Sequence, residues 1–411
     1  MNEIVNVNGY KIIYIISEKK ITSVHAYINT GSMFENEQQC GISHLLEHII
    51  TDSWERCKGN CTSYWSKKGV ISNAQTLTLY TRYFILGMSK EIDDMINYIA
   101  STITNPKIDS KCIKRSKQAI KDEILIRLNN PEWKLYNSFY ESMQDNTDFH
   151  GIQRIGNYPL HIKNLKTITQ KNLIDYYNKW YRPDNIFFVV VSNKPLSIVK
   201  SYFTKYLHKK SVTEFNKIEP YIICTRPTYI FNRKDAEKNS FLVGFINNNQ
   251  HPSDYLYYNL IQDMLTGDLS SFLYLTLRDK MNLIYGIKLI FEINKSYVLS
   301  IFEVSCQFEN AKKLINTLIK LLKQFVAGKY QSQLLNRSKE RISIIDMNNC
   351  HDNTEFLNVF YANQFIMSNK IDIIPDDYIK IISKITKEKL SKIVKRLFKF
   401  DQMLIACETK I

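Results

Sequence analysis

The sequence predicts an α+β protein made of two homologous domains, each with an antiparallel-rich sheet packed against helices. Three features indicate this class: an internal repeat, an opening strand hairpin and a globular composition. The 411 residues, 44% hydrophobic and 23% charged, are enough for two domains with sizeable cores. Apolar and polar residues alternate around Asn8 and Gly9, which predicts a strand hairpin and not a signal peptide. No apolar run approaches the ~20 residues that span a bilayer, so we expect no membrane contact.

The internal repeat begins with two matching segments, 24–50 and 242–268, each with the pattern of a strand, a polar turn and a helix. It continues in 83–103 and 301–322, which again read as a strand, a short turn and a helix with apolar residues at three- and four-residue steps. Both matches keep an offset of about 218 residues. A duplication of this kind predicts two domains of the same fold.

The domain boundaries are expected where this pattern is lost. Residues 209–227 show no clear periodicity and contain prolines, which is typical of a connecting segment. We therefore expect an N-terminal domain over 1–208, a linker over 209–227 and a C-terminal domain over 228–411.

The net charge of +15 raises the question of nucleic-acid binding. The basic residues are not clustered; they are spread through amphipathic segments such as 312–323 and 380–399. The chain also has no helix-turn-helix or ribonucleoprotein motif. We expect solvated basic faces and no nucleic-acid partner, with attraction of an acidic peptide or protein as the functional alternative.

The eight cysteines are scattered without the spacing of a disulfide framework. This predicts reduced thiols and a cytoplasmic location. Only Cys57 and Cys61 lie close together, at a separation that suits a metal or a redox pair. No second pair of cysteines or histidines follows at a zinc-finger distance, so we do not expect a metal at these two cysteines.

A polar cluster interrupts the apolar run 42-ISHLLEHII-50. On a helix, His44 and His48 lie one turn apart on the same face and can present two imidazoles to one zinc ion. Glu47 lies beside them, where it can exchange a proton with a water on the ion. The second copy of the repeat has Gln262 to Thr266 here, without histidine, so the fold does not require the cluster. The alternative is a pair of structural core histidines on an amphipathic helix.

The third ligand must come from another segment, and the best candidate is the helical pattern over 117–133. Its apolar face contains Ile120, Ile124 and Leu128. Glu123 neighbours that face, whereas Asp122 points further away. We therefore choose Glu123.

With these residues, the chain resembles the pitrilysin-type metallopeptidases, a group that includes insulin-degrading enzyme and mitochondrial processing peptidase. Their inverted zinc motif is similar to His44 to His48 followed about 75 residues later by Glu123. The resemblance covers nearly the whole chain. It extends to 31-GSMFENEQQCGISHLLEH-48, 72-SNAQT-76, 176-YYNKWYRPDNIFFVVVSN-193 and 269-LSSFLYLTLRDKMNLIYGI-287.

The resemblance implies a role for each matching residue. His44, His48 and Glu123 would hold Zn²⁺, and Glu47 would be the general base. Asn73 and Ala74 would bind the peptide backbone as the substrate adds to a sheet edge. Arg278 and Tyr285 would donate hydrogen bonds to the peptide and to the oxyanion. One departure is Ser116, at a position seven residues before Glu123 where the family often has a second glutamate.

For the whole protein, the resemblance implies one half of a clam shell that encloses peptides in a dimer chamber. We expect a zinc metalloendopeptidase that acts on peptide substrates, with a role in leader or precursor processing as one option. The alternative is a non-catalytic core or scaffold subunit of a heterodimeric peptidase. The partner would be either a second copy or a paralogous subunit.

Overall fold

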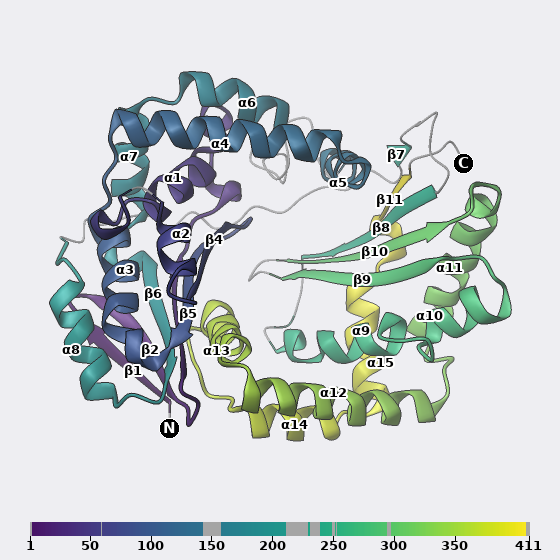
Figure 1. Ribbon diagram of the computed structural model, residues 1–411. Coiled ribbons are helices and arrows are strands. Elements are labelled where there is room, and N and C mark those ends of the chain that lie inside the picture. The colour runs from purple at the N-terminus through teal and green to yellow at the C-terminus, as the bar shows by residue number, and fades with distance from the viewer. Residues whose placement is uncertain are drawn as a thin grey trace.

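The computed structural model describes residues 2–407, except 59, 143–157, 211–228, 231–238, 249–250, 252 and 294–296. It confirms the predicted α+β class, with one sheet in each half of the molecule (Figure 1). The N-terminal sheet has the order β1-β2-β6-β3-β5-β4, in which every neighbouring pair is antiparallel except β2 with β6. Its strands are β1 (Asn2–Val7), β2 (Tyr10–Ile16), β3 (Ile21–Ile28), β4 (Ile71–Thr76), β5 (Thr81–Met88) and β6 (Ile186–Ser192).

The C-terminal sheet has the order β7-β11-β8-β10-β9, and only β7 with β11 is parallel. β4 and β9 are edge strands of the two sheets, and they correspond to each other in the internal repeat. The strands are β7 (Tyr229–Ile230), β8 (Asn239–Asn247), β9 (Gly286–Ile293), β10 (Val298–Cys306) and β11 (Met403–Cys407).

Most of the helices have a counterpart in the other half at about the repeat offset. The N-terminal half has α1 (Ile42–Thr51), α2 (Cys61–Ser66), α3 (Ile92–Thr104), α4 (Ser110–Asn129), α5 (Pro131–Ser142), α6 (Tyr158–Thr167), α7 (Gln170–Trp180) and α8 (Leu196–Tyr206). The C-terminal half has α9 (Tyr258–Thr266), α10 (Phe272–Tyr274), α11 (Ala311–Val326), α12 (Ser332–Asp352), α13 (Thr354–Ser368), α14 (Pro375–Ser383) and α15 (Lys387–Leu397).

The opening hairpin forms as the sequence predicts. Asn8 and Gly9 both have positive φ, 53° and 93°, which is the backbone that a two-residue turn of this kind requires. β1 then pairs with β2 from Asn2 opposite Ile15 to Val7 opposite Tyr10.

The two halves exchange one helix each. α5 packs on the C-terminal sheet, where Leu135 and Phe139 join a buried cluster with residues of β8, β10 and β11. Gly244 of β8 makes room for this contact, because a Cβ there would come within 2.3 Å of the Phe139 ring. Conversely, α13 packs on β3 and β6 of the N-terminal sheet through Tyr361 and Phe365. Figure 1 shows both helices crossing to the opposite half.

This exchange buries both faces of each sheet. On β6, Phe188 and Val190 face the N-terminal helices, while Phe187, Val189 and Val191 face α13. The period of two is the one expected of a strand covered on both sides. The predicted linker, 209–227, lies almost entirely outside the described residues, so the boundary at that point stays a prediction.

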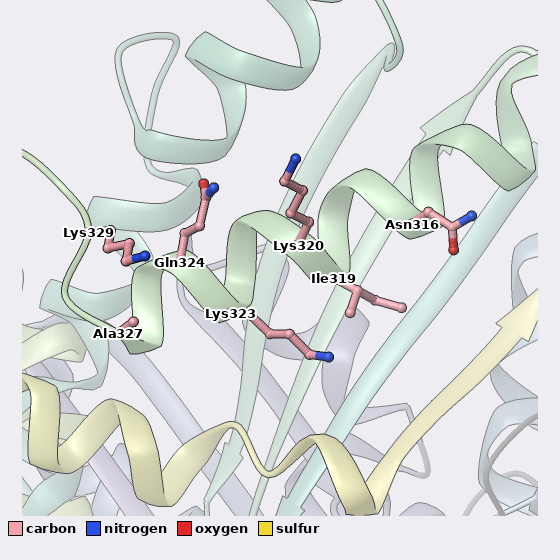
Figure 2. A pocket seen from close by; sticks show the side chains of 7 residues that line it. All are labelled: Asn316, Ile319, Lys320, Lys323, Gln324, Ala327 and Lys329. Carbon is pink, nitrogen blue, oxygen red and sulfur yellow. The ribbon is translucent and has the colours of Figure 1, made fainter.

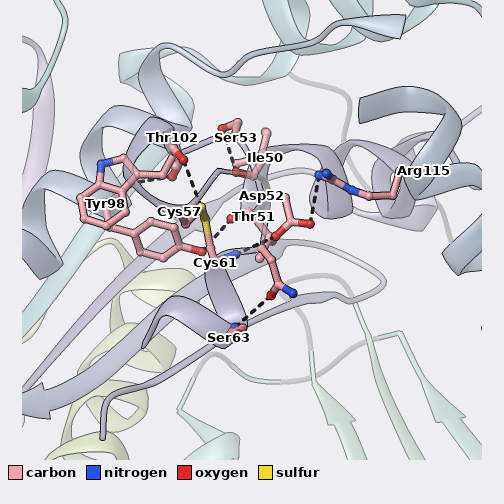
Figure 3. The surroundings of a disulfide bond; sticks show 12 residues. Ile50, Thr51, Asp52, Ser53, Cys57, Cys61, Ser63, Tyr98, Thr102 and Arg115 are labelled. Atoms are coloured by element: carbon pink, nitrogen blue, oxygen red, sulfur yellow. Dashed lines mark hydrogen bonds and ion pairs between the residues drawn. A yellow bond between two sulfur atoms is a disulfide. The ribbon is translucent and has the colours of Figure 1, made fainter. Parts of the chain in front are cut away.

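The prediction that all cysteines are reduced is wrong at one pair. A disulfide joins Cys57 and Cys61, whose Cα atoms are 4.9 Å apart (Figure 3). Cys57 ends a short turn (Glu55–Cys57) and Cys61 begins α2, and the backbone N–H of Asn60 donates a hydrogen bond of 3.1 Å to the carbonyl of Cys57. The cysteine argument for a cytoplasmic location is therefore weaker than the sequence suggests. Cys112, Cys306 and Cys350 are free thiols, and Cys224 lies outside the described residues.

The helices in the described part of the chain include none that is long and apolar enough to cross a membrane.

Candidate metal centre and active site

Helix α1 is fixed at its start by a buried carboxylate. Glu35, which is 1% exposed, accepts hydrogen bonds from the backbone N–H groups of Gly41 at 2.7 Å and Ser43 at 2.8 Å. These two groups lack partners within the helix, and the negative charge also suits the positive end of the helix dipole. The apolar face of α1 packs into the core, which leaves the opposite face to line a cavity. That packed face consists of Ile42, Leu45, Leu46, Ile49 and Ile50.

Three of the residues predicted to hold zinc come together at this cavity. The Nε2 atoms of His44 and His48 are 3.2 Å apart. Oε2 of Glu123, which α4 contributes, is 3.5 Å from Nε2 of His44 and 3.6 Å from Nε2 of His48. Asp122 is exposed and accepts a hydrogen bond from Gln118 instead.

The three donor atoms fit one zinc ion. Ligand atoms about 2.0–2.1 Å from a tetrahedral zinc lie roughly 3.3–3.4 Å from one another, close to the three separations found here. Two imidazoles and a carboxylate are also the donor types that zinc prefers. Among the described residues, this trio is the only group of three or more His, Cys, Asp or Glu side chains that could hold a metal.

The electrostatics of the trio suit a cation. Hydrogen bonds from His44 and His48, together with the charge of Arg127, hold the pKa of Glu123 well below its usual range. Burial lowers the pKa of His44, but Glu123 and Glu47 raise it overall above its ordinary value. The site is therefore rich in negative potential that a divalent cation would neutralise.

Glu47 lies on α1 between the two histidines and is 8% exposed. Its Oε2 atom accepts a hydrogen bond of 2.7 Å from the hydroxyl of Thr76, the last residue of β4. The base predicted from the helix is thus oriented by the strand that forms the edge of the sheet.

Strand β4 brings Asn73 and Ala74 to the same cavity. β4 pairs with β5 on one side only, with Asn73 opposite Phe84 and Ala74 opposite Tyr83, so its outer edge is open. Asn73 is exposed, and its Oδ1 accepts a hydrogen bond from the N–H of Ala74. An open edge of this kind can pair with an extended peptide.

The cavity itself has a volume of 1330 Å³ and lies between the two halves of the chain. One wall is the face of α1 with β4; the other is the C-terminal sheet with α5. On this second wall, Tyr140 donates a hydrogen bond to Glu292 of β9, and Tyr136 donates one of 3.1 Å to Glu303 of β10. The residues that line it from the C-terminal half include Lys288, Ile290, Phe291, Glu292, Ile293, Tyr297, Ile301 and Glu303.

Arg278 and Tyr285 are not brought to the zinc ligands of their own chain. Arg278 lies in a π-helical turn (Leu275–Lys280) after α10, and its Nη1 donates a hydrogen bond of 3.1 Å to the carbonyl of Tyr285. Tyr285 is 45% exposed, and neither residue lines the 1330 Å³ cavity. Figure 1 shows α10 and α1 in opposite halves of the molecule.

Four residues around the site were not predicted from the sequence. Two of them, Glu35 and Thr76, could have been found, because they lie inside the motifs that carry the family resemblance. Arg127 follows Glu123 by one helical turn, which was also readable. His161 of α6 gave no signal. Its ring packs against His44 at 5.5 Å between centroids and occupies the space that a Cβ on Gly41 would fill.

His161 is buried in a polar site without a hydrogen bond at Nε2 among the described residues. Burial, and then the charge of His44, lowers its pKa to about 3. It is therefore a neutral ring that packs beside His44. Ser116 is buried on α4 and provides no carboxylate at its position.

A second hollow of 440 Å³ lies on the outer face of α11 (Figure 2). Its charged lining residues are three lysines, Lys320, Lys323 and Lys329, and Lys320 and Lys323 point in different directions. It brings together no group of side chains for catalysis.

Two family models match the sequence. The model described as insulinase (peptidase family M16) matches residues 11–147, and the model described as the peptidase M16 inactive domain matches residues 167–342. The first contains His44, His48 and Glu123, and the second contains Arg278 and Tyr285.

Individual proteins match parts of the chain. An uncharacterized zinc protease of Rickettsia felis is 25% identical over 268 residues, which are 64% of this chain and 63% of that protein. The mitochondrial-processing peptidase subunit beta of Rattus norvegicus is 26% identical over 212 residues, 50% of this chain and 42% of that subunit. The aligned parts thus span less than two thirds of either relative.

A crystal structure of a protease from Helicobacter pylori has the same fold. It superposes with a TM-score of 0.87, with 100% of both chains covered, at 19% identity.

Proposed function

The chain belongs to peptidase family M16, as its resemblance to the pitrilysin-type metallopeptidases predicts, and on this premise we propose that it is a zinc-dependent endopeptidase. The observation that carries the proposal is the convergence of His44, His48 and Glu123 beside Glu47, at the open edge of β4. A non-catalytic subunit would not need a base oriented by a hydrogen bond next to a complete ligand set.

Substrate would bind as an added strand. β4 offers unpaired backbone groups on the side that faces the cavity, so a peptide can pair with Asn73 and Ala74 while its carbonyl approaches the zinc ligands. This pairing recognises the backbone and not the side chains, which suits a peptidase with a broad or leader-type substrate.

His44, His48 and Glu123 would hold the zinc ion, which supplies Lewis acidity at the scissile carbonyl when bound. Glu47 takes a proton from the attacking water and passes it to the leaving amine. The Thr76 hydroxyl keeps the Glu47 carboxylate in one orientation for both transfers.

The oxyanion donors would come from a second chain. Arg278 and Tyr285 lie away from the zinc ligands of the same chain, and Tyr285 is half exposed. A facing copy, or a paralogous subunit with the same two residues, would complete each site. The partner's arginine and tyrosine would then reach the peptide held on β4.

The rival function is a scaffold subunit without catalysis, and one experiment separates the two. Purified protein should contain about one zinc per chain and cleave quenched fluorescent peptides, with activity lost to a chelator and restored by zinc. Glu47→Gln should retain the zinc and lose cleavage, because the amide cannot accept the proton. Protein that binds zinc but shows no cleavage with any peptide library would favour the scaffold role.

A further inference from the structure

The two oxygens of the Glu123 carboxylate have different partners. Oε2 faces the histidines, 3.5 Å from Nε2 of His44 and 3.6 Å from Nε2 of His48. Oε1 forms an ion pair with Nη2 of Arg127, one turn further along α4. The carboxylate is therefore held with a single oxygen turned toward the metal position.

Arg127 is itself held from two further directions. Its Nη1 donates a hydrogen bond of 3.2 Å to the hydroxyl of Tyr158, the first residue of α6. Its guanidinium lies 4.9 Å from the ring centre of Trp133 and 5.9 Å from that of Tyr158. A planar guanidinium fixed by a stacking face and two hydrogen-bonding partners is more rigid than an amine on a flexible stem.

We propose that Arg127 is a positioning residue that orients Glu123 for the metal and thereby sets the zinc affinity of the site. This rests on the proposed zinc-peptidase function but makes a separate claim, since Arg127 does not touch the metal position or the substrate carbonyl. Such a positioning role is relevant here because Ser116 stands where the family often has a second glutamate, and it offers no carboxylate to orient the ligands.

Two effects of Arg127 oppose each other. Its positive charge repels a divalent cation, whereas its ion pair with Oε1 restrains the Glu123 carboxylate so that Oε2 stays beside the histidines. Partners that orient a metal ligand typically change metal affinity by 10–100-fold. Repulsion is damped here because the guanidinium charge is already balanced by Glu123 and about one third of the Arg127 side chain is exposed. Orientation is therefore the larger effect.

The test measures zinc affinity and does not depend on catalysis. Apoprotein is titrated with zinc in competition with a chromophoric chelator, for the wild type, Arg127→Met and Arg127→Lys. Methionine keeps an unbranched chain against Trp133 but removes both hydrogen-bonding directions. We expect the dissociation constant for zinc to rise about 10–100-fold in Arg127→Met, and to fall between this value and the wild type in Arg127→Lys.

The matched control is Arg115→Met. Arg115 also lies on α4 and also pairs with a carboxylate, Asp52, at 3.1 Å (Figure 3). The ion pairs of Glu123 among the described residues are with His44, His48 and Arg127, and not with Arg115. This variant should bind zinc within about twofold of the wild type. Trp133→Leu provides a second test if Arg127→Met fails to fold. It removes the ring that stacks on the guanidinium and leaves the ion pair, so the dissociation constant for zinc should rise by a smaller factor than in Arg127→Met. Far-UV circular dichroism of each apoprotein checks that the fold is retained.

The outcomes are distinct. Arg127→Met that binds zinc as tightly as Arg115→Met, with wild-type protein binding one zinc, would overturn the positioning role alone. Wild-type protein that binds no zinc would overturn both the proposed function and this inference.

Discussion

The hydroxyl of Thr76 donates a 2.7 Å hydrogen bond to Oε2 of Glu47, and so joins the open edge strand to the predicted catalytic base. Both residues face the 1330 Å³ cavity. Because Thr76 ends β4 and Glu47 lies on α1, this contact would hold the proposed base beside a peptide that pairs with β4.

The first prediction concerns this contact. Thr76→Val keeps the shape and the β-branched side chain but removes the hydroxyl, so the Glu47 carboxylate loses a hydrogen bond to a charged group, an interaction of about 1.5–3 kcal/mol. We expect kcat to fall about tenfold to a hundredfold with zinc content unchanged. Steady-state kinetics and metal analysis measure the two quantities. Thr76→Ser should retain most of the activity, and a serine variant as impaired as the valine variant would contradict the role of the hydroxyl.

The second prediction concerns the third ligand. Glu123→Gln should weaken zinc binding at least about a hundredfold and reduce cleavage with it, because a neutral amide replaces the anionic donor. Asp122→Asn should change neither, because Asp122 is exposed and bonds to Gln118. Zinc titration of both apoproteins checks this pair. If the aspartate variant were the impaired one, the proposed ligand set would be wrong.

Much of the site was readable because helical geometry is local. A spacing of four residues sets His44 and His48 on one face, and the apolar positions Ile120 and Ile124 place Glu123, not Asp122, toward that face. The repeat predicted two units of strand, turn and helix in each half for the same reason, since each unit carries its own periodicity.

The exchanged helices could not be predicted in this way. Tyr361 and Phe365 on α13 show which face is apolar, but not that this face covers β6, about 170 residues earlier in the chain. Contacts such as the ring of His161 against Gly41 depend on how two distant helices meet. Tertiary placement, and not local preference, decides both contacts.

In the C-terminal half, an ion-pair cluster lies where the repeat would put the zinc ligands. Asp263 of α9 is 4% exposed and pairs with Arg341 of α12 at 2.9 Å, and Arg341 is the residue that follows Glu123 by the repeat offset. Asp268 pairs with Arg337 at 3.0 Å and with Arg341 at 2.9 Å. The same pair of helices that offers a metal site in one half is thus joined by charges in the other.

The third prediction follows from that cluster. Asp263→Ala removes the buried carboxylate of the cluster and leaves Arg341 with Asp268 as its carboxylate partner, so we expect the C-terminal half to lose about 2 kcal/mol of stability. This is below the usual 3–5 kcal/mol for a broken buried pair, because the two arginines are about one third exposed. Hydrogen exchange in α9 and α12 should quicken. The exposed Asp279→Ala is the control, and equal exchange in the two variants would show that the cluster does not hold the helices together.

The last prediction concerns assembly. If each active site takes its zinc ligands from one chain and Arg278 with Tyr285 from the facing chain, two inactive variants should rescue each other. Glu47→Gln lacks the base, and the double variant Arg278→Ala with Tyr285→Phe lacks the oxyanion donors. Each alone should lose at least about a hundredfold in kcat. In a mixed dimer, one of the two sites combines an intact base with intact donors, so mixing under conditions of subunit exchange should restore activity toward half of the wild-type value per mixed dimer.

The control for this experiment is exchange itself, followed with one variant labelled by a fluorophore and the other by an acceptor. Exchange without recovery of activity would mean that a paralogous subunit supplies the donors, or that a closure of the two halves brings them to the site within one chain. A mixture of Glu47→Gln with Glu123→Gln provides the matched negative case. Both variants are damaged in the same set of residues, so no arrangement of these two chains contains an intact base and an intact ligand set together, and this mixture should stay inactive.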